Sequence, residues 1–316
     1  MSAPLSRHEA AAGVHSVHRF VFSVPDLDEA RRFYLAFGLD VRQEGERLDL
    51  YAAGHRHRWA SIHTREAGKR LEYLSLGIYE QDVPAMRERI ARLGIAADPH
   101  PLSDGQGLWL RNPDGTALQL LASPKVSPDE QSRPTPEPRR QPGQGAAPCR
   151  SQARQVRPRR LSHVLFFSPD VLRMVRFCEE VLGMRLSDRS GDVVAFLHGV
   201  HGSDHHLVAF AKSSHAGLHH SSWDVGSIDE VGRGSEQMRM AGYPDGWGVG
   251  RHVLGSNYFY YAQDPWGSYA EYSFDIDFVP ADIQWRSADH PPEDSLYVWG
   301  PSVPPEFFIN YEQAEA

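Results

Sequence analysis

The sequence of 316 residues contains only two cysteines, Cys149 and Cys178, which are too few for a disulfide framework and suit a reducing compartment. No apolar run reaches the roughly 18–20 residues that a membrane-spanning helix needs. Positive charge is also not in excess, because 33 Lys and Arg stand against 41 Asp and Glu and give a formal net charge of -8 at pH 7. That balance argues against a general partner for nucleic acid or anionic membranes. The opening MSAPLSRHEAAAGVHS lacks the apolar core of a secretory signal. We therefore expect a cytoplasmic protein with neither nucleic-acid nor membrane partners.

Residues 122–160 have almost no large apolar side chains and are rich in Pro, Gln, Ser and Arg. Such a segment cannot bury a core, so we expect an exposed connector between two domains, residues 1–121 and 161–280. Its arginines could contact nucleic acid, but acidic residues at its start and the acidic remainder of the chain argue against this. Residues 281–316 mix prolines with aromatic residues. We expect this C-terminal tail to pack across a domain surface or a subunit contact, or to cap a cavity.

The two domains resemble each other. HRFVFSVPDLDEARRFYLAFGLDV opens the first and HVLFFSPDVLRMVRFCEEVLGMRL opens the second. Each segment predicts an apolar strand, an amphipathic helix that begins after Pro-Asp, and a glycine where the helix ends. Further strand-like runs, a second helix (83–93 and 228–240) and a closing turn and strand follow in each half. The pattern predicts an α+β fold in which a β-α-β-β-β unit occurs four times and paired units form curved sheets around a cavity.

Aligning the halves pairs three polar positions of one with three of the other: His18 with His163, Tyr73 with His220, and Gln119 with Glu271. Two histidines and one carboxylate leave coordination positions open, and this is the ligand set of non-haem Fe(II) oxygenases. Tyrosine and glutamine are much poorer ligands at neutral pH, so we expect the metal only in the second half. A lone strand histidine or glutamate is more often a core or surface residue. Here all three positions correspond within a repeat.

The second half resembles the catalytic module of type I extradiol ring-cleaving dioxygenases, in the vicinal oxygen chelate superfamily that also contains glyoxalases and bleomycin-resistance proteins. The first half resembles their metal-free N-terminal module. The match rests on His163 in LSHVLFF, on His220 in LHHSSWDV, and on Glu271 four residues after Gly267. The resemblance implies two tandem modules built from four βαβββ units. It implies Fe(II) as the cofactor, although Mn(II) uses the same ligands.

Three further positions match polar residues of the family's active site. HLVAF points to His206, Gly-Arg-His to His252, and Tyr261 follows nine residues after His252. The resemblance implies that His206 acts as the acid–base group and that His252 and Tyr261 hydrogen-bond the substrate oxygens. Strand alternation predicts that the neighbours of the chosen residues face the opposite side. These neighbours are His205, His219 and Tyr260. Some nearby aromatic residues are expected to wall the substrate pocket and most to lie in the core or at the mouth, namely Trp223, Trp247, Tyr258, Phe259 and Trp266.

The function implied is extradiol cleavage of a catechol-type ring with O₂, giving a ring-opened semialdehyde or related acid, by a homo-oligomer of four or more subunits. Two alternatives stay open at this stage. Another metal-dependent enzyme of the superfamily, such as a glyoxalase or epimerase, usually takes its ligands from both paired modules. A non-catalytic binding protein dispenses with metal ligands. The residues do not separate monocyclic catechols or trihydroxylated rings from dihydroxybiphenyl-type substrates.

Overall fold

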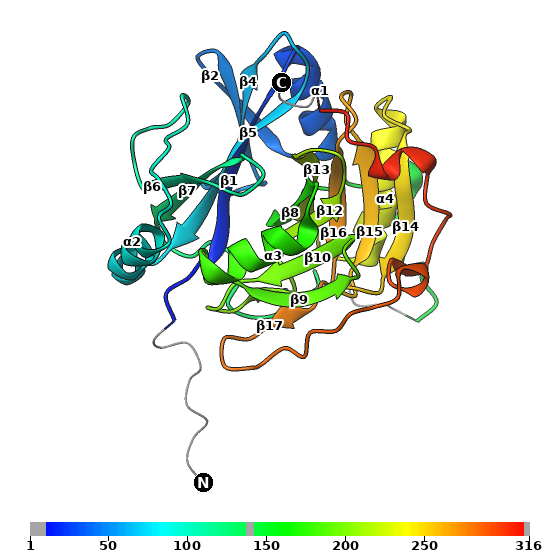
Figure 1. The fold of residues 1–316 in the computed structure, drawn as a ribbon. Helices are drawn as coiled ribbons and strands as arrows, with labels where there is room; N and C mark the ends of the chain where they lie inside the picture. The colour runs from blue at the N-terminus through cyan, green and yellow to red at the C-terminus, as the bar shows by residue number, and fades with distance from the viewer. Residues whose placement is uncertain (1–10, 137–141, 313–316) are drawn as a thin grey trace.

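The structure, a computed structural model, describes residues 11–136 and 142–312. It contains two large curved mixed sheets with two long helices packed on each, and the tail wraps around the later sheet (Figure 1). The two-module α+β fold expected from the repeats is therefore present. No helix in the described part of the chain is long and apolar enough to cross a membrane.

The first module has a seven-stranded sheet in the order β2-β3-β4-β1-β5-β7-β6. Its elements are β1 (Ser16–Val24), α1 (Leu27–Phe37), β2 (Asp40–Glu44), β3 (Arg47–Tyr51), β4 (Arg58–Thr64), β5 (Arg70–Ile78), the 3-10 turn η1 (Glu80–Asp82), α2 (Val83–Arg92), β6 (Leu108–Arg111) and β7 (Ala117–Ala122). The second unit, β5-α2-β6-β7, has one strand fewer than the predicted pattern. Residues 95–107, which include two prolines and two glycines, form no strand between α2 and β6.

The second module has a nine-stranded sheet in the order β18-β14-β15-β16-β13-β8-β12-β10-β9. Its main elements are β8 (Arg160–Ser168), α3 (Val171–Glu180), β9 (Arg185–Ser190), β10 (Val194–His198), β12 (Val208–Lys212), β13 (Gly217–Asp224), α4 (Ile228–Met240), β14 (Gly246–His252), β15 (Tyr258–Gln263) and β16 (Tyr269–Phe274). Short elements complete it: η2 (Arg150–Gln152), β11 (Ser203–Asp204), β17 (Phe278–Val279), η3 (Pro292–Asp294), β18 (Tyr297–Trp299) and η4 (Pro305–Phe308).

The same pairing rule builds both sheets. The first strands of two successive units pair antiparallel at the centre, β1 with β5 and β8 with β13. Within each unit the first strand also pairs parallel to the last, as β8 does with β12 and β13 with β16. In the second module this arrangement places β16, β13 and β8 side by side.

The first helix of each module begins at the predicted Pro-Asp. Asp26 accepts a hydrogen bond from the Glu29 N–H, and Asp170 accepts one from the Arg173 N–H, both at 2.9 Å. Each aspartate therefore satisfies an N–H that the first helical turn would leave unpaired. At its other end, α1 stops at Gly38, whose φ of 98° is a left-handed conformation that glycine adopts readily.

The two modules share one hydrophobic core. The rings of Phe37 in α1 and Tyr272 in β16 stack with centroids 4.0 Å apart, and the Tyr272 hydroxyl donates to the Phe37 carbonyl at 2.8 Å. The connector contributes to the same interface, because Val156 is 1% exposed and its N–H donates to Gln237 in α4. The expectation of a wholly exposed connector is therefore wrong at Val156. This apolar residue belongs to the hydrophobic core that the two modules share.

The tail returns to both modules at its end. In Figure 1 it runs from the β17 region past β14 and finishes near the first module. There the Glu312 carboxylate accepts hydrogen bonds from the backbone N–H of Leu71, in β5, at 2.9 Å and of Leu218, in β13, at 2.8 Å. One side chain of the tail thus joins equivalent strands of the two sheets.

Candidate metal centre and active site

The register of three adjacent strands brings the three predicted metal ligands together. Ser222 of β13 lies opposite both His163 of β8 and Glu271 of β16. His220 lies two residues before Ser222 and therefore on the same face of β13. Pairing alone thus places two imidazoles and one carboxylate on one side of the sheet.

The ligand atoms converge on one point. The Nε2 atoms of His163 and His220 are 3.4 Å apart, and Glu271 Oε2 lies 3.4 Å from the first and 3.7 Å from the second. Metal–ligand bonds of about 2.1 Å reach a common ion from atoms up to about 4.2 Å apart. All three residues are at most 3% exposed. In the described part of the chain, these three form the one group with metal-ligand spacing.

The carboxylate itself indicates a cation. Glu271 Oε1 accepts a hydrogen bond from Asn257 Nδ2 at 3.1 Å, whereas Oε2 is buried and has no hydrogen-bond donor among the described residues. A buried carboxylate oxygen without a partner is costly unless a positive charge faces it. The residues present therefore fit a divalent ion.

His206, His252 and Tyr261 line the same cavity as the ligands, which has a volume of about 180 Å³. The ring centroid of His206 lies 3.9 Å from that of His163. Burial, reinforced by His163, lowers the pKa of His206 well below its ordinary value, so this imidazole is neutral at rest. The structure places all six predicted site residues around one hollow.

Tyr261 and His252 form a hydrogen-bonded pair. The His252 Nδ1–H donates to the Leu296 carbonyl at 2.8 Å, which leaves Nε2 to accept the Tyr261 hydroxyl at 2.9 Å. Burial raises the pKa of Tyr261 well above 10, with Glu271 adding to the effect, and burial lowers the pKa of His252. The proton of the pair therefore resides on the tyrosine in the absence of substrate.

The expected opposite orientation is seen for Tyr260, which packs in the core shared by the modules while Tyr261 packs with Trp247 and Phe259. The expectation that His219 faces away from the site is wrong, because His219 lines the cavity beside His220. β13 contains a bulge: Leu218 pairs with Phe166 and His220 with Leu165, so His219 has no partner on β8. One extra residue interrupts the alternation on which the expectation depended.

His205 was expected on a strand, but it lies in the turn between β11 and β12. Its Nε2–H donates to Asp188 Oδ2 at 2.9 Å, and it does not line the cavity. None of the five aromatic residues that were considered for the pocket wall lines the cavity, although Trp247 and Phe259 pack against Tyr261 and His252. Trp223, for example, packs in the core against Phe20. The aromatic walls are instead Phe196 of β10 and Phe307 and Phe308 of the tail.

In the first module the position equivalent to His163 is Arg19, and the predicted equivalence with His18 is wrong, because Arg19 pairs with Ser75 as His163 pairs with Ser222. The other two corresponding positions, Tyr73 and Gln119, hold hydrogen-bonded side chains. Gln119 accepts from Ser75 Oγ at 2.7 Å and donates to the Gln106 carbonyl at 3.1 Å. The Tyr73 hydroxyl lies 3.4 Å from Arg19 Nη2, a cation that would repel a metal ion.

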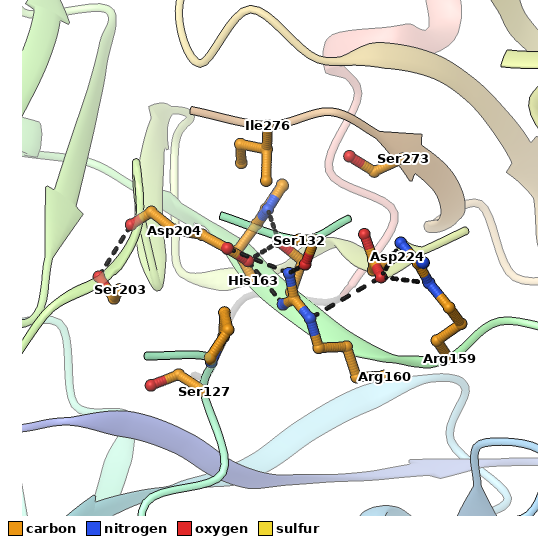
Figure 2. A network of polar contacts seen from close by, with 12 residues as sticks. Ser127, Ser132, Arg159, Arg160, His163, Ser203, Asp204, Asp224, Ser273 and Ile276 are labelled. Atoms are coloured by element: carbon orange, nitrogen blue, oxygen red, sulfur yellow. Dashed lines mark hydrogen bonds and ion pairs between the residues drawn. The ribbon is translucent and has the colours of Figure 1, made fainter. Parts of the chain in front are cut away.

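A network of ion pairs and hydrogen bonds holds the residues of β8 that precede His163 (Figure 2). Arg160 forms an ion pair with Asp204 at 2.6 Å and lies 3.8 Å from Asp224, which also binds Arg159. The Ser162 hydroxyl donates to the same Asp204 at 2.6 Å. The start of β8 is thereby fixed immediately before the first ligand.

The chain is 49% identical over 314 residues to "Metapyrocatechase 2" of Cupriavidus necator, covering 99% of this chain and 96% of that protein. It belongs to the extradiol ring-cleaving dioxygenases of the vicinal oxygen chelate superfamily. The family profile described as "Glyoxalase/Bleomycin resistance protein/Dioxygenase superfamily" matches residues 160–272 of this dioxygenase.

Two solved structures illustrate the breadth of the fold. The Mn(II)-bound glyoxalase from Novosphingobium aromaticivorans is 25% identical, with a TM-score of 0.74 and 96% of each chain covered. A homoprotocatechuate 2,3-dioxygenase variant from Brevibacterium fuscum is 16% identical, with a TM-score of 0.75, covering 99% of this chain and 86% of that one. At that identity the second similarity concerns the fold alone.

Proposed function

We propose that this dioxygenase opens the ring of a neutral, monocyclic catechol at an Fe(II) ion held by His163, His220 and Glu271. The meta-cleavage of catechols with O₂ follows from its family membership. The observation that supports this assignment of ligands is the convergence of two Nε2 atoms on Glu271 Oε2, a buried oxygen without a donor among the described residues. Mn(II) binds the same donor set, and the metal analysis described below decides between the two ions.

Fe(II) in this position would supply open coordination positions for a diol and O₂ and a path for electrons between them. The protein's own groups then handle protons. A substrate hydroxyl beside Tyr261 gives its proton to the tyrosine oxygen while the tyrosine proton passes to His252 Nε2. His252 becomes a cation whose Nδ1–H still donates to the Leu296 carbonyl. His206, neutral at rest, takes up a second proton and returns it as the O–O bond breaks.

The walls support a neutral ring. Among the described residues the walls contain no lysine or arginine, and Leu165, Phe196 and Phe307 are among the apolar residues that exclude water. A carboxylate on the ring would therefore be buried without a cationic partner. A cavity of about 180 Å³ is smaller than the about 300–1,000 Å³ of sites for drug-sized ligands, which favours one ring over a biphenyl.

The decisive experiment mixes the anaerobically Fe(II)-loaded protein with catechol and then admits air. We expect a yellow ring-fission product and consumption of one O₂ for each catechol, with both oxygen atoms recovered in the product when ¹⁸O₂ is used. Metal analysis of the active protein, with Mn(II) loading in parallel, identifies the ion. The matched control is Glu271→Gln, which keeps the shape of the site and removes its charge.

A glyoxalase would instead consume the adduct of glutathione and methylglyoxal without taking up O₂, and a binding protein would leave catechol unchanged. Either result would refute the proposal. We also propose a cytoplasmic location, in keeping with the free thiols of Cys149 and Cys178. We further propose an assembly of four or more subunits, supported by the exposed Val298 and Trp299 on the edge strand β18. Light scattering in solution measures that mass.

A further inference from the structure

Each of the three histidines grouped at the proposed metal position is hydrogen-bonded at Nδ1 by the residue immediately before it in the sequence. The pairs are Ser162–His163 at 3.2 Å, His205–His206 at 3.1 Å and His219–His220 at 2.7 Å. Three separate segments, β8, the β11–β12 turn and β13, thus repeat one local contact. The preceding residue in turn contacts a group that can only accept.

These acceptors determine where the protons lie. His219 Nε2 lies 2.7 Å from the Phe307 carbonyl, so Nε2 carries the proton and Nδ1 of the neutral ring is an acceptor. The hydrogen between the two Nδ1 atoms then belongs to His220. His220 Nε2, the atom 3.7 Å from Glu271 Oε2, consequently has a free lone pair.

The same reasoning applies to the other two pairs. The Ser162 hydroxyl donates its single hydrogen to the Asp204 carboxylate at 2.6 Å. Its oxygen is therefore left to accept from His163 Nδ1–H. His205 Nε2–H donates to the Asp188 carboxylate at 2.9 Å, so its Nδ1 accepts from His206 Nδ1–H. Asp204 is fixed by Arg160, as Figure 2 shows.

We propose that Ser162, His205 and His219 are positioning residues that hold the proton of the following histidine on Nδ1 and leave its Nε2 for the metal or the substrate. A histidine that ligates a metal through one ring nitrogen usually donates the other N–H to a neighbouring group, which fixes its tautomer and its orientation. This inference rests on the proposed function, because the Nε2 atoms serve the metal centre assigned there.

Two of the three acceptors also depend on the tail. Phe307 supplies the carbonyl for His219, and Asp188 is itself held by Trp285 Nε1 at 3.1 Å and by the Ala288 N–H at 2.7 Å. The tail therefore does more than wall the cavity, since it also determines which nitrogen of His220 is available. This role explains why the bulge at His219 is useful despite its interruption of β13.

The test replaces His219 in three ways. In His219→Asn, the amide oxygen stands where Nδ1 was and can accept from His220. In His219→Gln, the amide reaches the position of Nε2 and can bind the Phe307 carbonyl but not His220. His219→Phe keeps the ring volume and makes neither bond. His215→Phe is the matched control, because His215 also binds the tail, at the Glu312 carbonyl at 2.6 Å, but precedes no cavity histidine.

Two readouts apart from turnover are measured, namely the Kd for Mn(II) and the ¹⁵N spectrum of the histidine rings in the metal-free protein. We expect the Gln and Phe variants to weaken Mn(II) binding by about 10- to 100-fold, and the Asn and control variants to stay within about 3-fold of the wild type. The wild-type spectrum should show Nδ1–H at His220, whereas His219→Phe should show a mixture of both tautomers.

Equal losses in the Asn, Gln and Phe variants would overturn the inference, as would a wild-type His220 that carries its proton on Nε2. The spectrum needs no variant, so a misfolded protein cannot hide the answer. Failure of the wild type to bind Mn(II) at these ligands would instead refute the proposed metal centre, and the tautomer measurement would remain decisive for the inference.

Discussion

Lys69, in the turn before β5, forms a buried ion pair with Asp264, in the turn between β15 and β16. Both side chains are at most 2% exposed, and they are 195 residues apart in the sequence. Asp264 also accepts from the N–H groups of Trp266 and Ser268, at 2.9 and 3.1 Å. A charge of the first module is therefore neutralised only when the second has docked against it.

Removing one charge of this pair should destabilise the whole chain. Lys69→Met leaves Asp264 buried without its cation, and we expect a loss of about 3–5 kcal/mol in the free energy of unfolding. Adding Asp264→Asn should recover much of the loss. Urea titration measures both. The exposed pair Lys212–Asp192 is the control, where Lys212→Met should leave the free energy of unfolding nearly unchanged. Equal losses at the two sites would contradict this interpretation.

The charge of Glu271 should dominate metal binding. We expect Glu271→Gln to raise the Kd for Mn(II) by more than about 100-fold, because a ligand that contacts the ion matters more than the residues that support it. Titration followed by electron paramagnetic resonance measures the free ion. Glu72→Gln in the first module removes a carboxylate that pairs with His100 and should leave the Kd unchanged. Retention of tight binding in Glu271→Gln would exclude this residue as a ligand.

His206→Phe should separate binding from chemistry. Phenylalanine fills the space of the imidazole and cannot carry a proton, so catechol should bind anaerobically within a few-fold of the wild-type Kd. The turnover number should fall by about 10²- to 10⁴-fold. Absorbance of the product gives the rate, and an optical titration without O₂ gives the Kd. Turnover like that of the wild type would remove His206 from the mechanism.

The enzyme should discriminate strongly against catechols that carry a negative charge. We expect kcat/KM for a catechol that carries a carboxylate to be at least about 100-fold below that for catechol or a methylcatechol, since a buried unpaired carboxylate costs several kcal/mol. Val193 lines the cavity and is 44% exposed, so it lies at the mouth. Val193→Arg should place a cation at the mouth and reduce the ratio of the two kcat/KM values at least about 10-fold. Val193→Met should leave that ratio unchanged. Equal rates with both substrates in the wild type would refute the proposed preference.

Acid should weaken the fold in part through His15. Burial lowers the pKa of His15 from 6.5 to about 4, although a hydrogen bond to the Ser123 carbonyl opposes the effect. His15 therefore binds a proton more readily in the unfolded chain than in the folded one. The stability that neutral His15 contributes is fully present above pH 6.5 and is lost as the pH falls toward 4. We expect this residue to account for about 2 kcal/mol between pH 7 and pH 5. His15→Gln can keep the Ser123 bond and should reduce the pH dependence by that amount in urea titrations; an unchanged slope would show that His15 contributes nothing.

The sequence predicts the parts of the site that depend on strand periodicity and on the repeat. His220 and Glu271 correspond to Tyr73 and Gln119 as predicted, whereas His163 corresponds to Arg19 and not to His18. Neighbouring strands with fixed register bring the three ligands together. Likewise, Pro-Asp before each first helix is a local signal, and both helices begin there. The pattern also indicates that two modules, rather than one, make up the chain.

Features that depend on long-range packing could not be predicted in this way. The composition of the tail led us to expect that it packs across a surface or caps a cavity, but no local pattern indicates that Phe307 and Phe308 are the residues that line the cavity. The bulge at His219 leaves no mark in the hydrophobic pattern, although the doublets at 205–206 and 219–220 were a signal that could have suggested a role for the first histidine of each. The burial of Val156 could not be predicted, because a single apolar residue in a polar segment carries little information about burial.

The bulge in β13 also determines which side chains this strand presents to the hollow. A strand with strict alternation offers every second side chain to the hollow, so a ligand and a partner for it would have to come from different strands. One extra residue in the middle of a strand presents both side chains to the hollow and leaves the pairing of Ser221 and Ser222 beyond it intact. The equivalent strand of the first module has the same irregularity, because Val21 pairs with Tyr73 and Phe22 with Leu71, which leaves Glu72 without a partner on β1. The bulge is therefore common to both modules, and the second module differs in having histidines at these two positions.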